Sequence, residues 1–173
     1  MHEEYLLTTA EVAGALLGFV GVVLILNRRA EGVVSRQDQS GLFHLVYAAA
    51  GAMFFSLVMY AVLASAQSHG VIWRVGLVLI TLHITYGVTT AIMEGQEDEN
   101  RLNPVARHLL SAATFALIAF NICVIVGFFQ SYASLAYALS VTLMIGVAVS
   151  YFVPFVLLRS HQPGSSEGNE PDA

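Results

Sequence analysis

Five long apolar stretches follow one another along this chain, and each is about as long as a helix that crosses a lipid bilayer. Such a helix needs about 20 predominantly apolar residues, because each residue adds about 1.5 Å to its length. The chain is 57% hydrophobic with a mean hydropathy of +0.71, as expected if these stretches make up most of it. We therefore predict an all-α, polytopic integral membrane protein. Its five transmembrane helices are expected at residues 8–27, 41–66, 71–93, 105–129 and 132–158.

The five stretches leave room for short loops only, so we predict a single transmembrane domain over residues 1–159. The remaining residues, 160–173, are polar and acidic, and we expect them to form a disordered cytoplasmic tail. The N-terminal segment is acidic where a signal peptide would be basic, which predicts that the first helix is retained. The net charge of −5 argues against nucleic acid as a partner.

The arginine residues predict the orientation of the chain in the membrane. All seven cationic side chains are arginines. Six of them lie in the loops expected on one side of the membrane or beside those loops, and only Arg74 lies on the other side. The positive-inside rule then places the N-terminus outside and the C-terminus in the cytoplasm. We expect a multi-pass protein of the inner (cytoplasmic) membrane of a bacterial-type cell.

The first span carries small residues along one face. Gly14, Gly18 and the adjoining Gly21 are spaced by four and three residues, which places them on one side of a helix. Such a face allows the backbone of a second helix to approach closely. Glu11 lies three residues before Gly14, so its carboxylate is expected to project from the same face. Gly146 belongs to a similar small-residue face in the fifth span.

Glu11 also fits a local interpretation. The segment from Thr8 to Glu11 matches the capping-box pattern Thr-x-x-Glu, in which Thr8 caps the helix and Glu11 bonds back to the cap. The carboxylate would then lie about one turn inside the helix, near the outer lipid headgroups. The sequence leaves a helix cap and a functional carboxylate equally open at this position.

The third span is the most polar of the five. His83, Tyr86, Thr90 and Glu94 follow one another at helical spacing, so one face would carry most of its titratable groups. His83 is expected near the middle of the membrane, where an imidazole needs a partner. The threonines of this span have a simpler explanation, because their hydroxyls can bond to the backbone of the preceding turn. His83 is therefore the candidate for handling protons or cations.

A further polar layer is expected in the outer half of the membrane. Counted at about 1.5 Å per residue, Glu11, Tyr60, Asn121 and Ser140 lie at similar depths. These side chains could line a polar path, or they could form hydrogen bonds between helices that are worth about 0.6–1.7 kcal/mol each. Interhelical bonding is favoured, because it is the usual role of an asparagine inside a span.

Metal binding and catalysis have little support in the sequence. His44, Glu94 and His108 are expected near the cytoplasmic side, but no two of them form a compact ligand motif such as His-x-x-x-His. We predict no bound metal and no cofactor. The chain has no glycine-rich phosphate loop, no Gly-x-Ser-x-Gly motif and no His-Glu-x-x-His motif. An enzyme is therefore the third choice among the functions considered.

The favoured functional hypothesis is a small channel- or transporter-like protein in which the first and third helices line a path for protons or small cations. The alternative is a non-catalytic membrane subunit that docks another membrane protein through its small-residue helix faces. Both hypotheses predict the lipid bilayer and either a second copy or another membrane protein as partners. The residues expected along the path are Glu11, His83, Tyr86, Thr90, Glu94 and Asn121.

Overall fold

The computed structural model describes residues 2–31, 36–65, 69–94 and 104–157, which are helical throughout apart from a turn at 127–129. The predicted acidic tail at 160–173 lies outside the described residues. The elements in chain order are α1 (His2–Glu31), α2 (Arg36–Ser65), α3 (His69–Glu94), α4 (Pro104–Val126), the 3-10 turn η1 (Gln130–Tyr132) and α5 (Ala133–Leu157).

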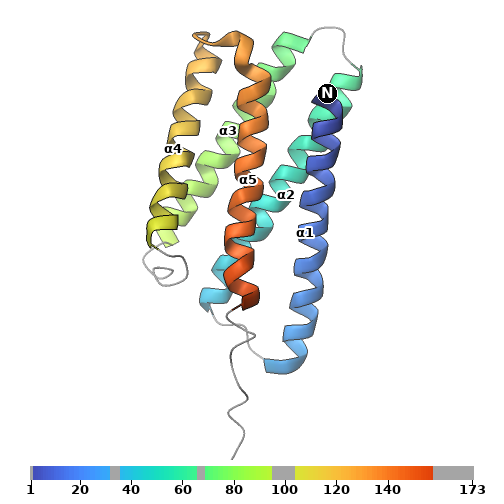
Figure 1. Ribbon diagram of the computed structural model, residues 1–173, viewed down its shortest axis with the longest axis vertical. Helices are drawn as coiled ribbons and strands as arrows, with labels where there is room; N and C mark the ends of the chain where they lie inside the picture. The colour runs from blue at the N-terminus through green and yellow to red at the C-terminus, as the bar shows by residue number, and fades with distance from the viewer. Residues whose placement is uncertain (1, 32–35, 66–68, 95–103, 158–173) are drawn as a thin grey trace, which may run out of the picture.

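All five α-helices contain a segment that is long and apolar enough to cross a membrane, which confirms the predicted number of long apolar helices. Successive helices run in opposite directions, so the N-terminus of α1 and the C-terminal end of α5 lie at opposite ends of the bundle (Figure 1). The apolar segments are Glu4–Val22, Ser40–Ser65, Gly70–Met93, His108–Val126 and Gln130–Val153.

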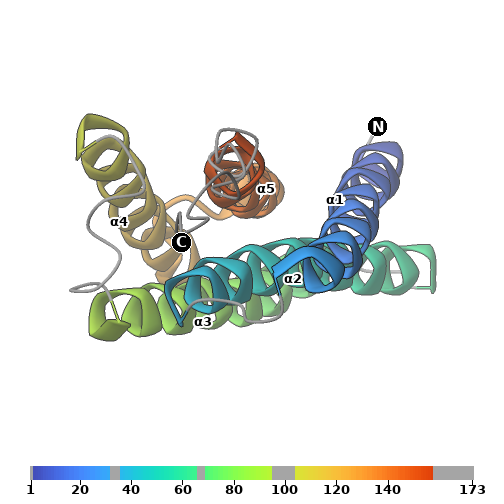
Figure 2. The same cartoon turned by 90° about the horizontal axis from the view of Figure 1, so that it is seen from below.

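The helices are arranged in two layers. Seen along the bundle, α2 and α3 lie side by side in one layer, and α4, α5 and α1 follow one another in the other (Figure 2). α5 is the most central helix, because it contacts every other helix of the bundle. α1 packs mainly against α2, whereas α4 packs against α3 and α5. Among the described residues, α1 and α3 do not contact each other.

The main core cluster draws most of its residues from α2, α3 and α5. Ile80 on α3 and Val141 on α5 are fully buried, and Tyr137 on α5 is nearly so. The Tyr137 hydroxyl donates a hydrogen bond of 2.8 Å to the backbone carbonyl of Phe55, which ties α5 to α2. Helices in lipid associate through close packing and hydrogen bonds, so small side chains are favoured at their contacts. The alanines buried in the bundle include Ala13, Ala48, Ala49, Ala52, Ala136 and Ala148.

α1 touches α5 at two separated places. Near its beginning, the Tyr5 hydroxyl donates a 2.9 Å hydrogen bond to the carbonyl of Ala138 and lies 2.7 Å from Oγ1 of Thr142. Further along, the rings of Phe19 and Phe152 meet edge to face with centroids 5.2 Å apart. The remainder of the α1 packing is directed at α2, which makes α1 a peripheral helix of the bundle.

The structure corrects the predicted start of the first helix. α1 begins at His2, so Thr8 and Glu11 both lie inside the helix and the predicted capping box is wrong. Thr9 Oγ1 donates to the carbonyl of Tyr5 at 2.7 Å, which is the bond that a threonine makes within a helix. The residues before Thr8 include leucines and glutamates, which favour helix and suit its positive N-terminal end. Glu11 is therefore not a cap.

α4 ends at Val126, three residues before the predicted end at residue 129. Gly127 has a φ of 113°, a conformation that a glycine adopts at little cost. Its N–H bonds to the carbonyl of Val124 at 3.2 Å, and the N–H of Phe128 bonds to that of Cys123 at 3.0 Å. This pair of bonds is the Schellman motif that closes a helix. The short connection makes α4 and α5 antiparallel neighbours.

Candidate functional site

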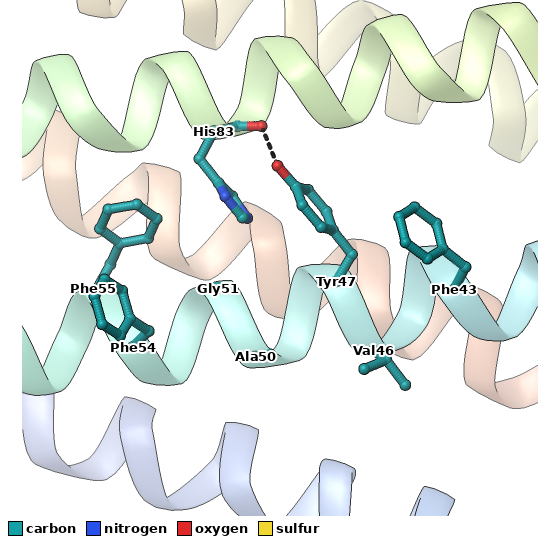
Figure 3. A pocket seen from close by; sticks show the side chains of 8 residues that line it. All are labelled: Phe43, Val46, Tyr47, Ala50, Gly51, Phe54, Phe55 and His83. Carbon is teal, nitrogen blue, oxygen red and sulfur yellow. Dashed lines mark hydrogen bonds between the residues drawn. The ribbon is translucent and has the colours of Figure 1, made fainter.

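A pocket of about 440 Å³ lies between α2 and α3 (Figure 3). Its rim is open, since Phe43, Val46 and Phe54 are 46%, 37% and 59% exposed. These rim residues belong to the apolar segment of α2, so the pocket would open toward lipid in a membrane. The residues that line it are Phe43, Val46, Tyr47, Ala50, Gly51, Phe54, Phe55 and His83.

His83 reaches from α3 to α2 and is held there by aromatic rings. The Tyr47 ring stacks on the imidazole with centroids 4.1 Å apart and planes 9° from parallel. The Tyr47 hydroxyl donates a 3.0 Å hydrogen bond to the backbone carbonyl of His83 (Figure 3). Phe55 approaches the imidazole edge to face, with a centroid distance of 5.2 Å. The imidazole is therefore fixed mainly by ring contacts with α2.

Two glycines make room for this pair of rings. A Cβ atom at residue 51 would collide with Nε2 of His83 and would lie 2.5 Å from Cε of Met144. A Cβ atom at Gly87 would lie 2.9 Å from Cε1 of Tyr47, well inside normal contact. A larger residue at either position would push a ring away from its neighbour. The close packing thus depends on Gly51 and Gly87.

The imidazole lacks the hydrogen bond that the sequence leads one to expect. Nε2 of His83 is buried and has no hydrogen-bond partner among the described residues. Tyr86 does not supply one, because it is 59% exposed and its ring tilts against Tyr47 at 5.9 Å. A neutral imidazole nitrogen can donate or accept one hydrogen bond, so Nε2 has unused hydrogen-bonding capacity within the apolar segment of α3.

The threonine hydroxyls of α3 donate to backbone carbonyls of their own helix. Thr81, Thr85 and Thr89 each donate to the carbonyl four residues earlier, at 2.6–2.8 Å, as predicted for threonines in a span. Thr90 donates to the carbonyl of Gly87 at 2.9 Å. Glu94 is the last residue of α3, and its side chain lies outside what the structure describes.

Asn121 links three helices in the core. Its Nδ2 donates to Oγ1 of Thr81 on α3 at 3.0 Å and to Oγ of Ser140 on α5 at 2.9 Å. Asn121 and Ser140 are fully buried. The two residues predicted to share a depth do meet, and their contact is a bond between helices. Of the other two predicted members of this layer, Glu11 is exposed on α1 and Tyr60 packs against the core cluster.

The small-residue face of α1 is mostly open within one chain. A Cβ atom at Gly14 would meet Sδ of Met53 at 3.5 Å, an ordinary contact, whereas Gly18 and Gly21 have no neighbour within 4 Å. Glu11, on the same face, is exposed. The close approach of a second helix predicted here is therefore not made by α2 to α5 at Gly18 or Gly21. Gly146 on α5 also has open space in the direction of a Cβ atom.

Two of the three weak candidates for a metal site, His44 and His108, have side chains that the structure describes. His44 on α2 places Nδ1 3.0 Å from the carbonyl of Ser40 and stacks on Tyr151 of α5, with centroids 5.5 Å apart. His108 is exposed on α4. Across the side chains that the structure describes, no group of three His, Cys, Asp or Glu residues is placed to hold a metal ion.

No family model, curated protein or solved structure matches this chain. A function must therefore be argued from the geometry. Two features of that geometry stand out against the packed remainder of the bundle. They are the face of α1 that carries Glu11, Gly14, Gly18 and Gly21, which is open at Gly18 and Gly21 and which we call the glycine face, and the pocket beside His83.

Proposed function

We propose that this protein is a membrane subunit that docks a helix of another membrane protein against the glycine face of α1. The observation that carries the proposal is the open space at Gly18 and Gly21 beside the exposed Glu11. The neighbouring face of α1, with Ala13 and Val20, is buried against the bundle. Small residues without an internal partner offer a second helix a place for close backbone contact.

The carboxylate of Glu11 strengthens this proposal. It lies within the apolar segment Glu4–Val22, about 10 Å from the beginning of that segment at 1.5 Å per residue. An acidic side chain costs about 2.5–3.5 kcal/mol at the centre of a bilayer and less toward its surface. Contact with a donor on a partner helix would offset this cost, whereas contact with lipid would not.

The carboxylate of Glu11 also indicates that the docking partner is a different protein and not a second copy of this chain. A two-fold dimer brings the same patch of both subunits together. Two copies packed through Gly14 and Gly18 would therefore bring their Glu11 side chains close to each other, and like charges repel. A partner helix with an arginine, a lysine or an amide at this depth would supply the opposite charge or a donor.

For the orientation we propose that the N-terminus lies outside and the C-terminus lies in the cytoplasm. The support is the distribution of the seven arginines, six of which belong to one end of the alternating bundle. The same rule supports insertion in a cytoplasmic membrane. Glu11 would then lie in the outer half of the bilayer, and the partner's donor is expected there.

Photocrosslinking in native membranes tests the docking proposal. A photoreactive residue at Val22, which is exposed on α1 close to the glycine face, should crosslink to one discrete membrane protein. Gly18→Leu should abolish that crosslink without changing thermal stability, because residue 18 has free space within the chain. Glu11→Gln should weaken the crosslink. The matched control Ala119→Leu adds similar bulk to an exposed position on α4 and should leave the crosslink unchanged.

Two results would overturn docking to another protein. A crosslink mainly to a second copy of the chain would replace it with self-association. A crosslink that survives Gly18→Leu would show that the glycine face is not the contact. Mass spectrometry of the crosslinked band decides the first case, and the intensity of that band in Gly18→Leu decides the second.

Permeation of protons or small cations is the second candidate function. The observation that favours it is His83, a titratable side chain near the middle of the segment Gly70–Met93 with an unpartnered Nε2. Since α1 and α3 are not in contact, these two helices alone do not line a path that joins Glu11 to His83. pH-dependent flux in proteoliposomes that is lost in His83→Gln would support permeation. A parent protein without flux would remove it.

A further inference from the structure

We propose that the pocket between α2 and α3 binds a neutral, membrane-soluble molecule with a flat ring that carries a hydrogen-bonding oxygen, the chemistry shared by quinones and phenols. This inference is independent of docking at α1, because it rests on different residues on different helices. Four observations carry it: the shape of the pocket, the position of its mouth, its single free polar group and the lack of charge around it.

The pocket is shaped for a flat ring. The small residues Ala50 and Gly51 form a stretch of α2 without bulky side chains (Figure 3). Aromatic side chains stand on both sides of this stretch, with Phe43 and Tyr47 toward one end and Phe54 and Phe55 toward the other. Aromatic groups pack favourably against another ring in offset or edge-to-face contacts. The volume of about 440 Å³ lies within the range of small-molecule sites.

The position of the pocket's mouth favours ligands that are soluble in the membrane. All the residues that line it lie within the apolar segments Ser40–Ser65 and Gly70–Met93. The exposed rim, at Phe43 and Phe54, would meet lipid rather than water. A ligand must then reach the pocket through the bilayer, which excludes ions and strongly polar molecules as its occupants.

His83 supplies the polar contact. Among the lining residues only Tyr47 and His83 carry polar side-chain atoms, and the Tyr47 hydroxyl already bonds to the carbonyl of His83. Nε2 of His83 lies against Gly51, which is itself part of the lining, and has no hydrogen-bond partner among the described residues. The imidazole must rotate away from its contact with Gly51 before a ligand beside Ala50 can reach this nitrogen. It can donate to a quinone carbonyl or accept from a phenol hydroxyl, depending on its tautomer.

The lining carries no carboxylate and no cationic side chain. A buried charge needs an opposite charge or several donors, and this pocket offers neither. The lining therefore matches a neutral molecule with one polar edge. Such a molecule would form a hydrogen bond with Nε2 of His83, and its ring would replace lipid against the aromatic side chains of the pocket.

Equilibrium binding in lipid nanodiscs tests this inference. Three probes share the same short alkyl tail: a benzoquinone, the corresponding hydroquinone and a benzene ring without oxygen. Saturable binding above that of protein-free nanodiscs is expected for the quinone, the hydroquinone or both, and at least about tenfold weaker binding for the ring without oxygen. Binding of the quinone alone would assign Nε2 as a hydrogen-bond donor, and binding of the hydroquinone alone would assign it as an acceptor.

Two variants locate the site. Ala50→Leu fills the pocket and should weaken binding of the oxygenated probe at least about tenfold, whereas Ala61→Leu, at an exposed position elsewhere on α2, should not. His83→Phe keeps a flat ring against Tyr47 but removes both nitrogens, so it should abolish the preference for oxygenated probes. The proposal fails if no probe binds above protein-free nanodiscs, if Ala50→Leu binds like the parent, or if His83→Phe keeps the preference. Ala50→Leu leaves His83 in place, so a folding defect in His83→Phe does not remove the test.

Discussion

The imidazole of His83 and the phenol ring of Tyr47 lie face to face, 4.1 Å apart and within 9° of parallel, although one belongs to α3 and the other to α2. Each ring lies against a glycine of the opposite helix, since His83 meets Gly51 and Tyr47 meets Gly87. The contact is therefore reciprocal. If one helix slid past the other, larger side chains would replace Gly51 and Gly87 beside the two rings. This arrangement therefore fixes the register of α2 against α3.

Gly51→Ala should destabilise the protein by about 1–3 kcal/mol, the usual cost of an added methyl group in a well-packed site. The new methyl group would collide with the imidazole of His83 and with Met144. Gly70→Ala is the matched control on α3, because nothing lies within 4 Å of its Cβ position. That control should be neutral or stabilising by up to about 1 kcal/mol. Unfolding in detergent micelles measures both, and equal stability of the two variants would contradict the packing described at Gly51.

Tyr47→Phe should cost about 0.5–1.5 kcal/mol, because it removes one hydrogen bond and leaves the ring stack in place. Tyr47→Leu should cost more, since it also removes the stack, a contact worth about a further 0.5–1.5 kcal/mol. Tyr86→Leu serves as the control, because Tyr86 is mostly exposed and makes only a tilted contact with Tyr47. The same unfolding assay applies. An equal loss in Tyr47→Leu and Tyr86→Leu would argue against a structural role for the stack.

Asn121→Ala should destabilise the bundle by about 1–3 kcal/mol, because two hydrogen bonds between helices are lost at about 0.6–1.7 kcal/mol each. Ser150→Ala removes a hydroxyl that bonds only to the carbonyl of Gly146 in its own helix, and it should change stability little. If Asn121 served a permeation path instead, Asn121→Ala would change flux at unchanged stability. Measuring unfolding and flux on the same preparation separates the two roles.

Reporter fusions should reveal the proposed orientation. A reporter that is active only in the cytoplasm should work when it is fused after Arg159 and stay silent when it is fused at Ser68. The two fusion points flank an odd number of spans, so one of them must lie on each side of the membrane. The opposite pattern would reverse the orientation and place Glu11 in the inner half of the bilayer.

The sequence was sufficient for most of the fold. The apolar lengths predicted five spans, and the structure contains five helices that meet the same criterion. The predicted start of the fourth span at residue 105 is one residue from the start of α4 at Pro104, where a proline is tolerated because no hydrogen bond is required of its nitrogen. The start of α1 was less predictable. A capping pattern at Thr8 competes with helix-forming residues on its N-terminal side, and the helix continued through them.

The candidate site was much harder to anticipate. The sequence marked His83 as a buried group in need of a partner, but it did not indicate that α2 would supply rings instead of a hydrogen bond. Helical periodicity reports which residues share a face, whereas the neighbour of that face depends on how the helices are arranged side by side. For the same reason the sequence did not show whether the first and third helices are neighbours. Among the described residues, α1 and α3 do not contact each other. The glycine spacing in α1 had the clearer pattern, yet the tightest glycine contacts lie at Gly51 and Gly87.

The packing of His83 on Gly51 and of Tyr47 on Gly87 also constrains how this sequence can vary during evolution. A single replacement at either glycine meets an immediate steric penalty, which is relieved at Gly87 by a smaller residue at Tyr47 and at Gly51 by changes at both His83 and Met144. Lineages that keep both rings are therefore expected to keep both glycines. Lineages that lose the ring of Tyr47 become free to vary at Gly87, so these two positions should change together when related genomes are compared, whereas Gly51 should vary together with both His83 and Met144.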